Sequence, residues 1–356
     1  MRFSSIFKII ILNIFISKMA HAAVCEERYP ADSEECQYVQ ELEQKAEQGD
    51  ESAQFSLGSW YAEGRYVKPD YKLAIKWLEK AGKQGSDFSY FILGYHYNYG
   101  ENFPLSRQKA LEWYRKAAEL GDSSTQEILG DAYMYGDGFP QNTQLALEWY
   151  RRAAAQGLAE AQDAIGVMFM QGEGVSQDYQ QALAWYRKAA RQGLPAAQTH
   201  LGIMSAFGRG VAQSDRQAIA WYRKAAKQDF AKAQYQLGVA YSTGRGVPEN
   251  SRNALKWYLK AAEQGFTPAQ SALGEIYAHG RQGVPKDNKQ AYIWYYMASM
   301  YTEKSKDDCS ALIAERNRLK GTLTPDQLSE TYAAFNLIWR KIDQSKEAKK
   351  IARKKY

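Results

Sequence analysis

Apolar and small residues recur at three- and four-residue spacing along most of this chain, in short runs that end at glycine. In residues 231–265, one such run ends at Gly244 and a second, which includes Ala254 and Tyr258, ends at Gly265. This spacing places side chains on one face of an α-helix, and glycine commonly follows a helix end. The loop between the runs holds two glycines and a proline, which interrupt helices. The pattern therefore predicts a helix hairpin, whose members we call helix A and helix B.

The hairpin is repeated with a step of 36 residues. Neither short helix can bury its apolar stripe alone, so neighbouring hairpins must stack against each other. We expect the glycine inside helix A to allow two backbones to approach closely, and tryptophans such as Trp149 and Trp185 to fill the interfaces between units. The positions that keep this step are Gly58, Gly94, Gly130, Gly166, Gly202, Gly238 and Gly274 inside helix A, and Trp77, Trp113, Trp149, Trp185, Trp221 and Trp257 in helix B.

The repeated pattern AxAQxxLGxxYxxGxGVxxDxxxALxWYRKAAxQG, as in residues 159–193, resembles the Sel1-like repeat, a relative of the tetratricopeptide repeat. The resemblance implies an all-α, right-handed α-solenoid of seven Sel1-like helix hairpins over residues 51–300. Residues 23–50 are expected to hold an N-terminal segment and a cap helix that corresponds to a lone helix B. Residues 301–356 are expected to form C-terminal capping helices and a basic tail, with Thr324, Pro325 and Gln327 starting a helix through a capping box.

Some copies depart from the pattern. Tyr66 and Asn102 replace the second loop glycine in the first two copies, and because tyrosine tolerates positive φ poorly, the first loop must differ in shape. In the fifth copy, Ser205 replaces an aromatic residue, Phe207 follows it, and Asp229 replaces the terminal glycine. This copy is either a repacked unit or a purpose-built pocket.

The first 22 residues have the form of a secretory signal peptide. Arg2 and Lys8 precede a short apolar run, and Ala20 and Ala22 provide a small-x-small cleavage site after Ala22. The run is too short for a transmembrane anchor, which takes ~20 apolar residues. Val24 stands before Cys25 where a lipoprotein needs a small residue. The sequence therefore predicts an exported protein of a Gram-negative periplasm.

The charge of the chain is close to balanced once residues 1–22 are removed. That removal takes away three basic residues and no acidic ones, which leaves 43 Lys and Arg against 40 Asp and Glu. The basic excess lies in residues 341–355. Such a tail contacts anionic lipid or an acidic partner, or is merely solvated, as terminal charge runs usually are. The compartment argues against nucleic acid as a partner.

The chain has three cysteines. In an oxidising compartment, Cys25 and Cys36 can close a short disulfide loop before the cap helix. Cys309 is then left over. It is free and buried, or it pairs with one of the other two, and spacing alone does not decide among these connectivities.

The residues that carry chemistry are few and scattered. Beyond residue 22 the histidines are His96, His200 and His279, and no two of them share a repeat. We expect His96 and His279 near exposed positions of helix A, as ordinary surface histidines. The string SRQK at Ser106–Lys109 lacks the partner motifs of a lactam-recognising enzyme. The sequence thus predicts no enzyme, no metal site and no cofactor.

Helix A offers a candidate contact surface. In the tetratricopeptide architecture, helix A lines the concave groove, and the positions one, four and five after its glycine face outward. Apolar and aromatic residues fill many of these positions, which predicts a groove that binds another protein; the alternative is packing between neighbouring A helices. The predicted partner-binding residues are Tyr95, Tyr99, Met134, Tyr135, Met170, Ile203 and Phe207.

Together these features predict a non-catalytic protein-binding scaffold in the periplasm. Exported Sel1-like proteins include immunity proteins that bind and block toxic effectors, phospholipases among them, and envelope adaptors for polysaccharide export or assembly. A cell-wall or lactam hydrolase would instead require a clustered acid, base or nucleophile in the groove.

Overall fold

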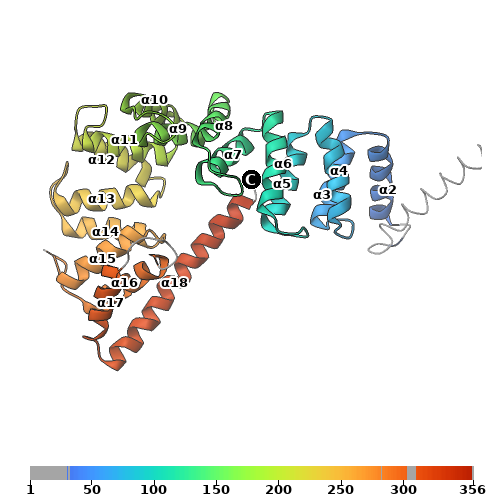
Figure 1. Ribbon diagram of the computed structural model, residues 1–356. Coiled ribbons are helices and arrows are strands. Elements are labelled where there is room, and N and C mark those ends of the chain that lie inside the picture. Colours follow the sequence, from blue (N-terminus) through green and yellow to red (C-terminus); the bar gives the residue numbers. More distant parts are fainter. Residues whose placement is uncertain (1–29, 31–32, 282, 303–309, 355–356) are drawn as a thin grey trace, which may run out of the picture. The chain divides into compact units, whose positions relative to one another are not determined.

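Helices follow one another along the described chain, which comprises residues 30, 33–281, 283–302 and 310–354 of the computed structural model (Figure 1). The chain divides into unit 1, residues 1–176, and unit 2, residues 177–356. The helices of unit 1 are α2 (Glu34–Glu47), α3 (Glu51–Glu63), α4 (Tyr71–Lys83), α5 (Asp87–Tyr99), α6 (Arg107–Leu120), α7 (Ser123–Tyr135), α8 (Thr143–Ala155) and α9 (Ala159–Gln171). Those of unit 2 are α10 (Tyr179–Arg191), α11 (Pro195–Phe207), α12 (Asp215–Ala226), α13 (Ala231–Thr243), α14 (Ser251–Ala262), α15 (Thr267–His279), α16 (Asn288–Thr302), α17 (Ser310–Lys320) and α18 (Pro325–Lys354).

Odd-numbered helices from α3 to α15 are the A helices, and the even-numbered helices that follow them are the B helices. Within each unit, an A helix packs against the B helix of its own repeat, as α5 does against α6 and α13 against α14. Each B helix then packs against the next A helix, as α6 does against α7. The prediction of an all-α solenoid of helix hairpins is confirmed.

The loops after the A helices of the second to seventh repeats use left-handed backbone at two positions. In the third repeat these are Gly136 and Gly138, with φ of 71° and 81°. Asn102 takes the second position in the second repeat with φ of 57°, which its short polar side chain permits. Tyr66 holds that place in the first repeat without a positive φ. Its ring packs on Trp60 instead, with centroids 4.5 Å apart, so this loop does differ in shape.

The glycine inside helix A faces a tyrosine ring of helix B in the same repeat. A Cβ built on Gly238 would lie 2.5 Å from Cδ1 of Tyr258, well inside van der Waals contact. The closest approach at this repeat is therefore between the glycine and a ring. Two backbones do approach in the first repeat, where a Cβ on Gly58 would lie 2.9 Å from the backbone nitrogen of Leu78.

The tyrosines of helix B are buried more completely than the tryptophans beside them. Tyr150 and Tyr186 are almost fully enclosed. Trp149 is buried, but Trp185 is only half-buried, and the ammonium of Lys188 lies 3.8 Å from its ring centroid. The two tryptophans are therefore packed to different degrees, because a solvated lysine covers part of the Trp185 ring.

Glutamine side chains join each repeat to the one before it. Gln126 on α7 donates to the carbonyl of Ala118 at the end of α6, at 3.0 Å. Gln156 at the end of α8 donates to the carbonyl of Gly121 at 2.8 Å and to Oε1 of Gln126 at 2.9 Å. These bonds satisfy carbonyls that a helix end leaves without an internal partner. The same amide pair recurs as Gln84–Gln54, Gln228–Gln198 and Gln264–Gln234.

The second repeat has neither of these glutamines. Tyr90 and Leu120 stand at the two positions, and the Tyr90 ring lies over Gly82. A Cβ on Gly82 would lie 2.5 Å from that ring. Six other copies carry alanine at this place, namely Ala46, Ala118, Ala154, Ala190, Ala226 and Ala262. The three substitutions thus act together, because a ring replaces an amide and the methyl group beneath it is absent.

Helix caps occur at both ends of the described chain. Ser33 accepts a hydrogen bond from the backbone of Cys36 and starts α2. At α18, the Thr324 backbone N–H donates to the Gln327 side chain at 3.0 Å, and the Gln327 N–H donates to the Thr324 hydroxyl at 3.3 Å. This reciprocal pair is a capping box, as the sequence predicts.

Several predictions fall outside the described residues. They are the signal peptide of residues 1–22, the positions of Cys25 and Cys309, and the side chains of the basic tail beyond residue 344. Cys36 is disulfide-bonded. None of the helices in the described part of the chain is long and apolar enough to cross a bilayer.

Candidate functional site

One face of α5 carries four aromatic rings in a continuous row. Phe88, Phe91, Tyr95 and Tyr99 follow at three- and four-residue spacing, so they share one side of the helix. Their successive ring centroids are 5.6, 6.5 and 4.6 Å apart. Phe88 is 53% exposed and Tyr99 is 47% exposed. The sequence predicted Tyr95 and Tyr99 but missed the two phenylalanines, which the same spacing could have revealed.

The other predicted contact residues differ in exposure. On α7, Tyr135 is 75% exposed, whereas Met134 beside it is buried inside unit 1. Met170 on α9 is half-buried. In unit 2, Phe207 is 59% exposed and Ile203 is half-buried on α11. Aromatic rings at the fifth position after the glycine therefore reach the surface, while the methionine at the fourth position of the third repeat packs inward.

The A helices of unit 1 also carry carboxylates. Glu127 and Asp131 lie one turn apart on α7, and Tyr150 donates its hydroxyl to Oδ1 of Asp131 at 2.5 Å. Burial raises the pKa of Glu127 to about 7, and the negative charges of Asp131 and Glu160 add to this effect. No group of three or more His, Cys, Asp or Glu suited to a metal ion occurs among the described residues. The helix α7 therefore carries both carboxylates and the exposed ring of Tyr135.

His96 is buried on α5, which corrects the expectation of an exposed position. Its ring stacks on Phe103 with centroids 5.0 Å apart, and Nδ1 lies 3.2 Å from the carbonyl oxygen of Glu101. Burial lowers the pKa of His96, although this carbonyl and the carboxylates of Glu63 and Glu101 oppose the effect. The imidazole is therefore a packing group of the repeat, held in its neutral form at pH 7.

Replacing His96 with phenylalanine is expected to reduce the loss of stability between pH 7.5 and pH 5.5. The pKa of His96 is lower in the folded chain than the ordinary ~6.5, so the unfolded chain binds the proton more readily. Stability therefore falls as pH drops below ~6.5, by up to ~1.4 kcal/mol per pH unit for one such group. Thermal melts at the two pH values measure this change. His279→Gln, at an exposed histidine, is the control, and an equal pH effect in wild type and His96→Phe would contradict the assignment.

The remaining histidines and Ser106 make contacts within the array of repeats. The His200 ring lies 4.9 Å from the Tyr186 ring, and Nδ1 of His279 lies 3.1 Å from the carbonyl oxygen of Glu275. Ser106 of the SRQK string caps α6, because its hydroxyl accepts from the backbone N–H of Lys109. A nucleophile, base and charge stabiliser do not converge at any of these side chains.

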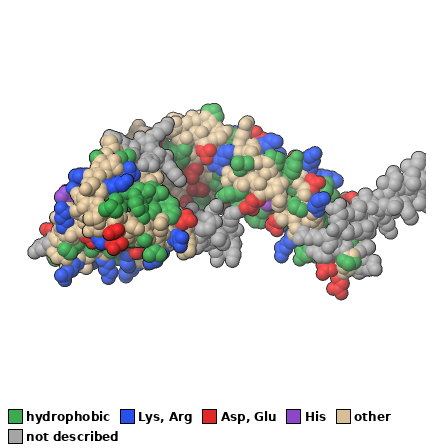
Figure 2. Space-filling model, turned by 90° about the horizontal axis from the view of Figure 1, so that it is seen from below, with side chains coloured by type: hydrophobic (Ala, Val, Ile, Leu, Met, Phe, Trp, Pro, Cys, Tyr) green, Lys and Arg blue, Asp and Glu red, His purple; other side chains and the backbone are tan. Residues whose placement is uncertain are grey.

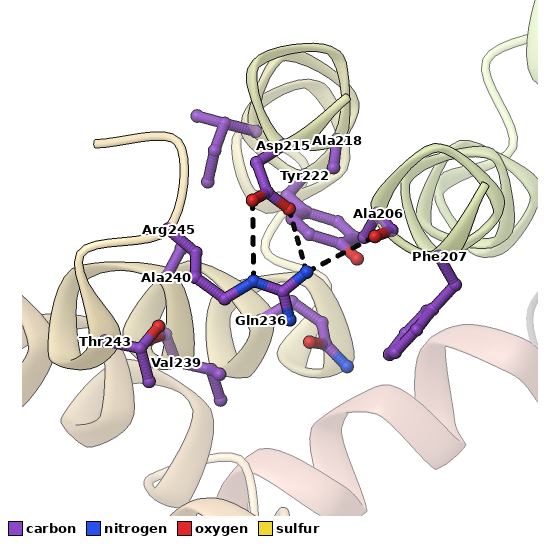
Figure 3. A pocket seen from close by; sticks show the side chains of 11 residues that line it. Ala206, Phe207, Asp215, Ala218, Tyr222, Gln236, Val239, Ala240, Thr243 and Arg245 are labelled. Carbon is purple, nitrogen blue, oxygen red and sulfur yellow. Dashed lines mark hydrogen bonds and ion pairs between the residues drawn. The ribbon is translucent and has the colours of Figure 1, made fainter. Parts of the chain in front are cut away.

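Unit 2 contains a cavity of about 90 Å³ at the fifth and sixth repeats. Figure 3 shows Arg245 reaching across it toward Asp215, with Phe207 at one side and Val239 at another. Arg245 donates to Oδ1 of Asp215 at 3.0 Å and to the carbonyl oxygen of Ala206 at 3.3 Å. The fifth copy, which the sequence marked as unusual, therefore contributes to a pocket.

The Arg245–Asp215 pair has a counterpart with reversed charges. In unit 1, Arg107 pairs with Asp137 at 2.8 Å, and these residues stand at the positions that Asp215 and Arg245 occupy in later repeats. Both pairs join the start of one B helix to the loop of the next repeat. Since the positions match, this ion pair is a structural link between repeats and is not peculiar to the cavity of unit 2.

Charges of both signs are interspersed over the face of the molecule seen in Figure 2, among patches of hydrophobic side chains. This agrees with the nearly balanced composition. That face offers no broad basic surface of the kind that a phosphate backbone requires.

Comparison with known proteins identifies the repeat. A family described as Sel1 repeat matches residues 51–86, 88–122, 123–158, 159–194, 195–230, 231–266 and 267–300. No curated protein matches the chain.

Two solved structures are similar over most of the chain. A protective antigen present in uropathogenic Escherichia coli strains, which displays an SLR fold, is 32% identical with a TM-score of 0.62 over 87% of this chain. The match spans 64% of that protein's length. A Sel1 repeat protein from Oxalobacter formigenes is 35% identical with a TM-score of 0.66, over 77% of this chain and 78% of that protein.

A third structure is more distant. The immunity protein PA5088 from Pseudomonas aeruginosa is 22% identical with a TM-score of 0.44, over 58% of this chain and 76% of that protein. A likeness at this level carries no argument about function.

Proposed function

Since the chain belongs to the Sel1 repeat family, we propose that it is a non-catalytic scaffold that binds another protein through its A helices, in the periplasm. The exposed rings of Tyr99 and Tyr135 carry this proposal, because they stand at the same position of successive repeats. Tyrosine is enriched at protein interfaces and at their energetic hot spots. Large exposed apolar patches on soluble proteins usually mark contact sites.

The absence of catalysis is part of the proposal. Among the described residues, His96 is buried against Phe103, and Ser106 serves as a helix cap. A scaffold needs only a contact surface, whereas a hydrolase needs a nucleophile and a base within hydrogen-bond reach of each other. The described side chains favour the scaffold.

The specific role we propose is immunity, in which the chain binds and blocks a toxic effector delivered by a rival bacterium, such as a phospholipase. An exported binding protein can do this by covering the effector's active surface. An envelope adaptor for polysaccharide export or assembly requires the same kind of surface. The partner's identity therefore decides between the two roles.

Replacing both Tyr99 and Tyr135 with alanine is expected to weaken partner binding by ~2 kcal/mol or more, about thirtyfold, if the two rings form a hot spot. Tyr135 is 75% exposed and Tyr99 is 47% exposed, so the melting temperature should change little. The measurement is affinity capture from periplasmic extract with wild type and the double variant, with thermal melts of each. Equal recovery of the same partner by both proteins would refute the proposed surface.

The capture experiment also separates the two roles. Tyr38→Ala, at an exposed ring of the cap helix α2, is the matched control and should retain the partner. If the partner is a secreted toxin, periplasmic co-expression of wild type should restore the growth of cells that carry it, and the double variant should not. A partner from the envelope export machinery would support the adaptor role instead.

The mature protein is expected to begin at Ala23. Ala20 and Ala22 supply the small-residue pair that signal peptidase requires. Mass spectrometry of protein from a periplasmic fraction measures the N-terminus. Retention of Met1, or lipidation at Cys25, would refute the proposed soluble periplasmic location.

A further inference from the structure

Ala206 lines the cavity in unit 2 at a position where other repeats carry residues from alanine to methionine. Ala206 occupies the position of Met134 and Met170 in the third and fourth repeats. Its methyl group borders a space between α11, α12 and α13 that Val239 and Ile219 also line. The space of about 90 Å³ exceeds the ~10–15 Å³ that one water needs and falls below the ~300 Å³ of small-molecule sites. It suits one aliphatic side chain.

The rim of this pocket is positively charged. Arg209 and Arg245 stand at the same loop position of successive repeats, and their guanidinium carbons lie 5.4 and 5.9 Å from the ring centroid of Phe207. Asp215 balances Arg245. Among the described residues, no carboxylate forms an ion pair with Arg209. The position that Asp215 occupies relative to Arg245 is occupied, one repeat earlier, by Tyr179. One positive charge beside the pocket is therefore uncompensated.

We infer that this pocket binds a segment of a partner protein in which an aliphatic side chain lies next to an aspartate or glutamate. The aliphatic side chain fills the space beside Ala206, and the neighbouring carboxylate pairs with Arg209, with Arg245 adding to the positive field. The exposed Phe207 ring packs against apolar atoms of the same segment. This inference rests on the proposed scaffold function and specifies the chemistry of the partner.

The test uses random twelve-residue peptides displayed on phage and selected against the full mature chain. Selected peptides are then synthesised, and their affinities are measured for wild type and three variants. Ala206→Met fills the pocket with the residue that two other repeats carry, so it should melt no lower than wild type. Arg209→Gln removes the uncompensated charge. Arg216→Gln, on the exposed side of α12, is the matched control.

We expect the selected peptides to share a Leu, Ile or Met within two residues of Asp or Glu. Ala206→Met should weaken their binding about tenfold or more. Arg209→Gln should weaken it about threefold, as an exposed ion pair allows, and raising the salt concentration should remove this difference. Arg216→Gln should bind within about twofold of wild type.

Three results would overturn the inference. The first is that no peptide is enriched over the bare support, and the second is that the selected peptides bind Ala206→Met as well as wild type. If the peptides that bind Ala206→Met as well as wild type no longer bind the Tyr99→Ala/Tyr135→Ala variant, the scaffold function stands and only the pocket assignment fails. The third is that Ala206→Met changes the sedimentation of the chain alone, which would make a second copy the occupant.

Discussion

Replacing Tyr186 with alanine is expected to lower the free energy of unfolding by ~3–5 kcal/mol, while the same change at Trp185 costs clearly less. The two residues are adjacent on α10 and differ in burial. Tyr186 is 0% exposed, so its removal leaves a cavity in a close-packed interior. Trp185 is half-buried, and the flexible side chain of Lys188 can settle over the space that its ring leaves.

Guanidinium chloride unfolding followed by circular dichroism measures both variants. Because repeats unfold partly independently, the transition midpoints are compared rather than extrapolated free energies. Trp149→Ala is a useful control. Because Trp149 is buried, this variant should lose more stability than Trp185→Ala. If Trp185→Ala unfolds at as low a denaturant concentration as Tyr186→Ala, the tryptophan is as important to the interface as the tyrosine, and the difference in burial does not govern stability here.

Much of the fold follows from the sequence because the hairpin is repeated without a change of length through six steps. A single periodic run can be mistaken for another element, but a glycine that returns every 36 residues restricts the choice to one hairpin. The capping box at Thr324 was equally readable, because it depends on two residues at fixed spacing. Features that depend on a few residues at fixed spacing can be predicted from the sequence, because few other structures fit them.

Which aromatic ring is buried was not readable from the pattern. Trp185 and Tyr186 are neighbours, and one residue turns a helix by about 100°, so both lie near the edge of the same apolar stripe. The glycine of helix A holds the missing information, because it accommodates the ring of helix B, as Gly238 does for Tyr258. That match spans two helices and appears only when they are packed.

The candidate surface shows the same limit. Met134 and Tyr135 were predicted together, yet one is buried and the other is 75% exposed. The pocket of unit 2 lies in the copy that the sequence marked as unusual through Ser205 and Phe207. Ala206 lines this pocket, and its difference from the methionines that the third and fourth repeats carry at its position is seen only when the copies are compared.

Replacing Gly82 with alanine is expected to destabilise the wild-type chain but to stabilise a chain that carries Tyr90→Gln and Leu120→Gln. In wild type the new Cβ would lie 2.5 Å from the Tyr90 ring, and this ring stacks on Trp113 at 5.8 Å, so it has little room to move. Overpacking of this kind costs ~1–3 kcal/mol. In the glutamine background the ring is absent, and alanine gains ~1 kcal/mol over glycine in a helix.

Denaturant midpoints of wild type, Gly82→Ala, the double variant and the triple variant measure this coupling, which we expect to be ~1–3 kcal/mol. Ala118→Gly, at the same position one repeat later and bonded through its carbonyl to Gln126, is the matched control. It should cost ~1 kcal/mol in both backgrounds, because no ring lies over it. If Gly82→Ala destabilises both backgrounds equally, the glycine serves some need other than the Tyr90 ring. A reversal of sign would instead establish that Gly82, Tyr90 and Leu120 form one packing solution between the first two repeats, which replaces the glutamine link used elsewhere in the chain.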